Sequence, residues 1–195
     1  MMTLMIPVRI LDCGVYHPWR YRGEHNPHRD NQTKRMMDFK DSRNAGFEQA
    51  VTEFTRLVKS TIDTISVRRG QLMVPLVNMS FTIAIVPSSR AGVHSEGLIR
   101  VATALAQIYP NATVNPSLYR VTTVPSAHRE NGDRSIHTHM QSIEVRGYDR
   151  VRESAVLILD DVTTTGGSLS ACYYLMKDAG ADIVVPLSIL ATASY

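Results

Sequence analysis

The chain has 195 residues, of which 44% are hydrophobic, and its 21 Lys+Arg against 18 Asp+Glu give a formal net charge of +3. This composition is ordinary for a globular protein and excludes a disordered or collagen-like chain, and the length allows one domain with its own core. Two cysteines are too few for a disulfide framework or a four-cysteine zinc site.

The sequence carries no sign of a membrane segment. No run of about 18 apolar residues occurs, so we expect no membrane-spanning helix and no membrane partner. The apolar start of the chain lacks a basic region before it and is interrupted by Pro7 and Arg9, unlike a signal peptide. We therefore expect a cytoplasmic protein in which both cysteines stay reduced.

Basic residues concentrate in the first part of the chain. Residues 1–75 hold 12 basic and 8 acidic residues, whereas residues 76–195 hold 9 and 10. The densest stretch, residues 20–43, contains seven Lys and Arg residues with four acidic residues among them. Such a stretch is either a solvated surface or a site for nucleic acid or a phosphorylated metabolite. The interspersed acids favour the solvated surface, so a nucleic-acid partner is not expected.

The first 80 residues predict little regular structure. Weak alternation indicates a strand over 4–11, and residues 13–35 are rich in His, Arg, Asn, Pro and Gly and predict a long irregular loop. Trp19 lies in this loop, where it either stacks on a base or packs the loop down. Apolar residues at three- and four-residue steps predict an amphipathic helix from about residue 44 to 66.

From residue 81 the pattern is that of an α/β domain. Strands are predicted at 81–86, 118–121, 141–146, 156–159 and 183–190, and helices at 94–109 and 168–179. The polar residues 122–138 have no apolar period and predict a loop. The repeated order of strand, helix and strand indicates a mainly parallel sheet flanked by helices.

The most informative segment is Val156-Leu-Ile-Leu-Asp-Asp-Val-Thr-Thr-Thr-Gly-Gly-Ser168. An apolar strand runs into two adjacent acids, and a Thr/Gly turn leads into a helix. In a parallel sheet, ligands bind beyond the carboxyl ends of the strands. The helix N-terminus, with hydroxyls from Thr164, Thr165 and Ser168, forms a phosphate cradle that glycines allow the ligand to approach.

The acids Asp160 and Asp161 would repel a phosphate unless they face other groups. Sugar hydroxyls donate hydrogen bonds to carboxylates, and hydrated Mg²⁺ takes oxygen ligands, so the segment predicts a site for a phosphorylated ribose. A Walker B element would need a G-x-x-x-x-G-K-[ST] loop, which is absent. The acidic pocket of a receiver domain would follow the first strand. A purely structural turn remains an alternative.

Residues 156–168 resemble the phosphoribosyl pyrophosphate (PRPP) signature of type I phosphoribosyltransferases. Within it, the sequence Asp-Asp-Val-Thr-Thr-Thr-Gly is most similar to that of the ComF-like group. The resemblance covers about residues 81–190. It implies an α/β type I phosphoribosyltransferase-like core over residues 81–195, with a small hood over residues 1–80. It also implies a Mg²⁺-dependent glycosyltransferase that moves the 5-phosphoribosyl group to a nitrogenous base or amine, releases pyrophosphate and forms a homodimer. The alternative is a non-catalytic protein of the same fold that senses PRPP or a nucleotide, or associates with nucleic acid.

The resemblance also assigns residues. It implies that PRPP is bound by Asp160, Asp161, Thr163, Thr164, Thr165, Gly166, Gly167 and Ser168. It implies that Ser88, Ser89 and Arg90 bind pyrophosphate, and that a mobile lid within residues 122–138 supplies His128, Arg129 and Arg134. The expected catalytic residues are Asp160, Asp161, Arg90 and Arg129. Asp160 and Asp161 are expected to hold Mg²⁺ through water.

Two features differ from known phosphoribosyltransferases, and a third suggests a different kind of site. ComF-like proteins commonly carry an N-terminal set of zinc-binding cysteines, which this chain lacks. Thr164 stands where 6-oxopurine phosphoribosyltransferases typically have an aspartate that handles the purine N7 proton, which disfavours hypoxanthine and guanine. His137 and His139 would face the same way on a strand, but no third ligand for a transition metal is evident.

Overall fold

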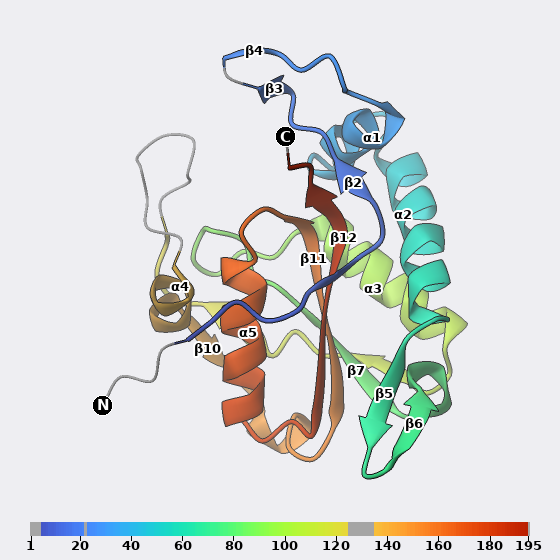
Figure 1. The fold of residues 1–195 in the computed structure, drawn as a ribbon, viewed down its shortest axis with the longest axis vertical. Helices are drawn as coiled ribbons and strands as arrows, with labels where there is room; N and C mark the ends of the chain where they lie inside the picture. The colour runs from blue at the N-terminus through green and yellow to red at the C-terminus, as the bar shows by residue number, and fades with distance from the viewer. Residues whose placement is uncertain (1–4, 22, 125–134, 195) are drawn as a thin grey trace.

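The computed structural model describes residues 5–21, 23–124 and 135–194, and its centre is a parallel sheet. Within these residues six strands form the sheet in the order β1-β12-β11-β7-β8, and β2 pairs with β12 further along. Figure 1 shows β12, β11 and β7 at the centre of the molecule. The bounds of the six strands are β1 Leu11–Asp12, β2 Val15–Tyr16, β7 Phe81–Ile85, β8 Ala112–Val114, β11 Ala155–Thr163 and β12 Ile183–Thr192. All these pairings are parallel, which confirms the prediction of an α/β fold with a mainly parallel sheet.

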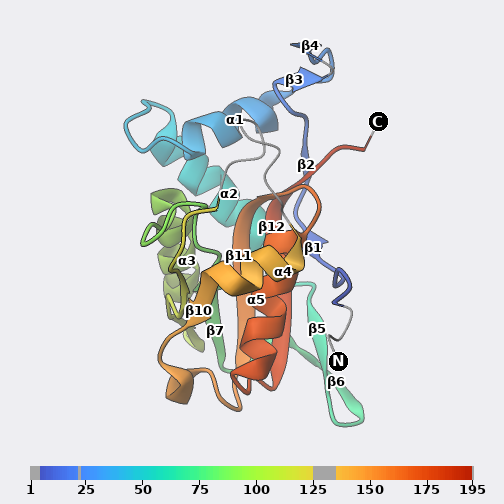
Figure 2. The same cartoon turned by 90° about the vertical axis from the view of Figure 1, so that its left-hand side faces the viewer.

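Helices cover both faces of the sheet. Helices α2 (Phe47–Ile62) and α3 (Glu96–Ile108) lie on one face, and α5 (Gly167–Asp178) lies on the other (Figures 1 and 2). Successive residues of the central strands pack on opposite faces of the sheet: Ile83 lies in the core cluster with α2 and α3, whereas Ala84 lies in the cluster with α5. Because both faces are buried, these strands are nearly continuous apolar runs, which made them recognisable in the sequence.

The N-terminal region is more regular than its sequence predicts. The expected strand over 4–11 starts only at Leu11. The expected loop over 13–35 contains β2, the hairpin of β3 (Arg20–Tyr21) and β4 (Glu24–His25), and the first half of α1 (Asn31–Phe39). Only three residues of α1 are buried, so its apolar period is too sparse to recognise. Asp30 begins the helix, because its side chain accepts a hydrogen bond from the Thr33 N–H.

The segment between β8 and β11 also differs from prediction. Strands β9 (Leu118–Arg120) and β10 (Ile143–Val145) pair antiparallel outside the main sheet. Helix α4 (Ile136–Ser142) includes the last residues of the loop expected at 122–138 and the first two residues of the strand expected at 141–146. Its start is fixed by Ser135, whose side chain accepts from the Thr138 N–H. The remaining elements are the hairpin of β5 (Ser66–Arg69) and β6 (Leu72–Pro75) and the 3-10 turns Leu76–Asn78 and Tyr148–Arg150.

Residues on both sides of position 80 share one core. Met36, Phe39 and Phe54 lie in the same buried cluster as Ile83 and Leu157 of the central strands. At Gly97 of α3, an added Cβ would lie 2.7 Å from Cζ of Phe39, so glycine allows α1 to approach α3 closely. The N-terminal helices therefore pack directly onto the sheet that carries the acidic motif. In the described part of the chain, no helix combines the length and apolarity that crossing a membrane requires.

Candidate functional site

A cavity of about 830 Å³ lies at the carboxyl ends of β7 and β11. Its core wall includes Asp160, Asp161 and the turn 163–168, together with Ser88 and Ser89. The structure thus gathers most of the predicted site residues around one space. Arg90 is exposed and is not among the lining residues. His128, Arg129 and Arg134 lie outside the described residues.

The Thr/Gly turn presents an uncapped helix end to this cavity. Strand β11 continues through the acidic pair to Thr163, longer than predicted, and α5 begins at Gly167 with no side-chain cap. The first N–H groups of a helix have no partner within it, so they are available to an anion. Gly166 has φ +76°, and an added Cβ there would lie 2.6 Å from Cδ1 of Ile10. The turn therefore requires glycine for both its backbone angle and its packing.

The two acids lie close together in a half-buried position. Asp160 Oδ1 accepts a hydrogen bond from the Asp161 N–H at 2.8 Å, and Asp161 Oδ2 lies 3.2 Å from Nζ of Lys40. Burial, and next the charge of Asp161, raise the pKa of Asp160 to about 7, against the opposing charges of Lys40 and Arg120. The pair therefore carries a charge that the protein compensates only in part. A cation or hydroxyl donors in the cavity would stabilise it.

A buried arginine that the sequence analysis did not single out organises the Ser88 side of the cavity. Arg120 of β9 is 2% exposed. Its Nε donates to the Ser88 carbonyl at 2.6 Å, and its Nη1 donates to Oγ of Ser142 at 2.6 Å. Burial lowers its pKa. Arg120 thus fixes the backbone that follows β7 against α4.

The prediction that His137 and His139 face the same way is wrong, because they lie on helix α4 rather than on a strand. His137 is exposed and hydrogen-bonds to Gln141, whereas His139 is buried and lines the cavity. The His139 ring lies 3.3 Å from Oγ of Ser168 and 3.5 Å from Nη2 of Arg120. It therefore links the arginine to the Thr/Gly turn. The described residues contain no group of three or more His, Cys, Asp or Glu that could hold a metal ion.

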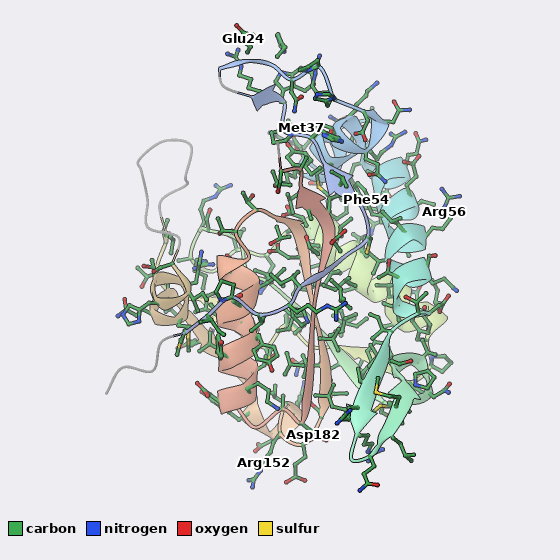
Figure 3. The ribbon with its side chains drawn as sticks, in the orientation of Figure 1. Glu24, Met37, Phe54, Arg56, Arg152 and Asp182 are labelled. Atoms are coloured by element: carbon green, nitrogen blue, oxygen red, sulfur yellow. The ribbon has the colours of Figure 1, made fainter. Side chains whose placement is uncertain are left out.

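The opposite wall of the cavity, called here the hood wall, comes from the N-terminal region. It consists of Tyr16, Pro18, Trp19, Arg20, Met37 and Lys40. Arg20, Met37 and Lys40 lie in the basic stretch 20–43 that the sequence singled out, and Trp19 was considered there as a residue that stacks on a base. Figure 3 shows Met37 at this end of the molecule, while Asp182 and Arg152 lie at the opposite end of the sheet.

No protein-family model matches this chain, and no curated protein matches it either. The chemistry of the site therefore has to follow from its geometry. An uncapped helix N-terminus suits a phosphate, two carboxylates suit a diol or a hydrated cation, and the Ser88–Ser89 backbone offers a second polar surface. All three lie on one wall of one cavity.

Proposed function

We propose that this protein is a Mg²⁺-dependent phosphoribosyltransferase, which binds PRPP, transfers its 5-phosphoribosyl group to a nitrogen acceptor and releases pyrophosphate. One observation carries the proposal: a single cavity wall combines the uncapped start of α5, the acids Asp160 and Asp161, and the Ser88–Ser89 segment. PRPP carries a phosphate, a ribose diol and a pyrophosphate. The start of α5, the acids Asp160 and Asp161, and the Ser88–Ser89 segment suit these three groups in that order.

In this proposal each part of PRPP has its own partners. The 5′-phosphate binds the N–H groups and hydroxyls of residues 164–168, and the ribose hydroxyls donate to Asp160 and Asp161. The pyrophosphate lies on Ser88 and Ser89, whose backbone Arg120 holds from behind. We assign Arg90 and the lid residues Arg129, His128 and Arg134 to the leaving pyrophosphate, as the family resemblance implies. Thr163 ends the strand beneath the turn.

The acidic pair also suits Mg²⁺. Mg²⁺ commonly keeps several waters and takes one or two carboxylates together with phosphate oxygens of the substrate, so a complete protein cage is not required. The raised pKa of Asp160 fits a site that gains from an added cation. When bound, Mg²⁺ would supply positive charge to the pyrophosphate oxygens. Asp160 and Asp161 would hold it through water.

The reaction needs positioning and charge stabilisation more than acid–base chemistry. A lone pair of the acceptor nitrogen forms the bond to C1′, and the electrons of the C1′–O bond leave with pyrophosphate. The ribose carries positive charge in between, and the neighbouring carboxylates stabilise it. Holding the acceptor beside C1′ under the hood wall makes the attack effectively intramolecular.

Calorimetric titration of PRPP, with and without Mg²⁺, tests the proposal. We expect saturable binding that Mg²⁺ strengthens, and a loss of about tenfold or more in Asp160→Asn, because hydrogen bonds to a charged group contribute about 1.5–3 kcal/mol. Asp182→Asn is the matched control, since Asp182 is exposed at the far end of the sheet. Equal PRPP affinity in Asp160→Asn and the control would contradict the placement of the ribose. Tight binding without pyrophosphate release from any tested acceptor would favour a PRPP sensor.

A further inference from the structure

The hood wall contains an aromatic surface that its neighbours hold in place. The carbonyl of Trp19 accepts a hydrogen bond from the Asn26 N–H at 3.2 Å. The guanidinium carbon of Arg29 lies 3.9 Å from the centre of the Trp19 ring, and the His25 ring meets it edge-on at 5.9 Å. The residue is nevertheless 45% exposed and lines the cavity. A fixed, half-exposed indole of this kind suits a planar ligand.

The charges on this wall are positive. Arg20 and Lys40 line the cavity beside Trp19, and within the described chain the only carboxylates that line it are Asp160 and Asp161 on the core wall. Lys40 is paired with Asp161 at 3.2 Å. Arg20 makes one long hydrogen bond, from Nη1 to the Gly23 carbonyl at 3.4 Å, and no ion pair among the described residues. Its guanidinium is therefore available for a carboxylate, which it can bind through two N–H groups.

We infer that the acceptor of the proposed transferase is a planar aromatic ring that carries a negative charge, with a ring carboxylate as the favoured form. This inference rests on the proposed function, which places the acceptor between the ribose and the hood wall. The ring stacks on the face of Trp19 that Arg29 does not cover, and its carboxylate binds Arg20, with Lys40 at the edge of the same space. A ring nitrogen then faces C1′.

This assignment also satisfies the chemistry of the transfer. The lone pair of the ring nitrogen forms the N–C1′ bond while the C1′–O electron pair leaves on pyrophosphate, and any proton on that nitrogen passes to water. A neutral base would leave the charge of Arg20 unpaired and would find no carboxylate on the hood wall to accept from its own N–H groups. An anionic ring matches the positive charge and needs no such acceptor.

The single tryptophan of the chain provides the test, because Trp19 fluorescence reports only on the hood wall. The probes are two matched pairs: pyridine-3-carboxylate with pyridine-3-carboxamide, and pyrimidine-6-carboxylate in its dione form (orotate) with uracil. Each is titrated with Mg²⁺ and ribose 5-phosphate present, so that no transfer occurs. In at least one of the two probe pairs we expect the carboxylate to bind about tenfold or more tightly than its neutral partner. A hydrogen bond between a carboxylate and the charged Arg20 guanidinium contributes about that much.

The variant Arg20→Gln tests the assigned residue. We expect it to reduce the ratio of carboxylate to neutral affinity to below about threefold, while Arg68→Gln, an exposed arginine of the β5–β6 hairpin, keeps the wild-type ratio. Thermal unfolding of both variants confirms that they fold. If wild-type protein binds PRPP but shows no preference for either carboxylate, or Arg20→Gln keeps it, the acceptor inference is overturned and the proposed function stands. If wild-type protein does not bind PRPP, both are overturned.

Discussion

The two walls of the cavity are built in different ways. The core wall is held by buried groups: Arg120 is 2% exposed and bonds to Ser88 and Ser142, and the acids lie on a central strand. On the hood wall, Trp19 and Met37 are 45% and 47% exposed. The core wall is thus part of the folded core, whereas the hood wall contributes little burial. Substitutions on the first should change stability and binding together, and those on the second should change binding alone.

The largest effect is expected for Arg120→Met. Methionine fills a similar space but leaves the Ser88 carbonyl and Oγ of Ser142 without their buried donor. Buried polar groups left unsatisfied cost about 1–3 kcal/mol each, so we expect the free energy of unfolding to fall by about 2–4 kcal/mol. Urea unfolding measures this loss. PRPP affinity should fall as well, because the Ser88 backbone loses its support.

Arg68→Met is the control for this comparison. Arg68 lies exposed on the β5–β6 hairpin, so its loss should change stability by less than about 0.5 kcal/mol. If the two variants are equally stable, the buried arginine is not what holds the core wall.

The second effect concerns the charge of Asp160. Its pKa is raised to about 7 in the folded protein, above its ordinary value of about 4, so the folded state binds the proton more tightly. The stability that this carboxyl contributes is complete below pH 4 and is lost as the pH rises to 7. Without Mg²⁺, Asp160→Asn should therefore match the wild type near pH 4 and be about 1–3 kcal/mol more stable at pH 8.

Unfolding by urea at several pH values checks this pH dependence. Asp182→Asn is the control, because Asp182 is exposed at the far end of the sheet. A constant difference between Asp160→Asn and wild type from pH 4 to 8 would contradict the raised pKa. At pH 8 we therefore expect Asp160→Asn to have a higher free energy of unfolding than wild type and a lower affinity for PRPP.

The core wall was predictable where its signals are local. The strand 156–159, the acids and the Thr/Gly turn are contiguous, and apolar runs that end in turn residues identify strands without tertiary information. Arg120 could not be found in this way. Its partners Ser88 and Ser142 lie 32 and 22 residues away: the pairing of β9 with β10 brings Ser142 beside it, and a backbone hydrogen bond from the Gly92 N–H to the Arg120 carbonyl brings the Ser88 loop.

The hood wall was the least predictable region for the same reason. Helix α1 buries only Thr33, Met36 and Phe39, so no apolar stripe marks it. Lys40 was recognised as part of a basic stretch, but its pairing with Asp161 joins residues 121 positions apart. The strand expected at 141–146 was right in its centre and too long at its start. Residues Ile143–Val145 form β10, but Gln141 and Ser142 end the short helix α4, whose start is set by the cap at Ser135.

The third effect is expected at the turn of the core wall. Gly166→Ala forces a side chain into a left-handed conformation at φ +76° and places its Cβ 2.6 Å from Cδ1 of Ile10. Gly70→Ala is the matched control, because Gly70 also has positive φ (+62°) but no atom lies within 4 Å of the added Cβ. We expect about 1–2 kcal/mol of destabilisation from the backbone in both. Only Gly166→Ala should also lose PRPP affinity, as measured by calorimetry, because its turn holds the phosphate; a similar loss in both variants would exclude that role.

The smallest effect on stability is expected for Lys40→Gln on the hood wall. The ion pair with Asp161 is partly exposed, with 45% of the Lys40 side chain accessible, and exposed pairs contribute about 0–1 kcal/mol. The free energy of unfolding should therefore change by less than about 1 kcal/mol, while the preference of the hood wall for a carboxylate ring weakens. Urea unfolding and Trp19 fluorescence titration measure the two quantities on the same protein. A loss of stability as large as that of Arg120→Met would mean that the hood wall, like the core wall, is an integral part of the folded core.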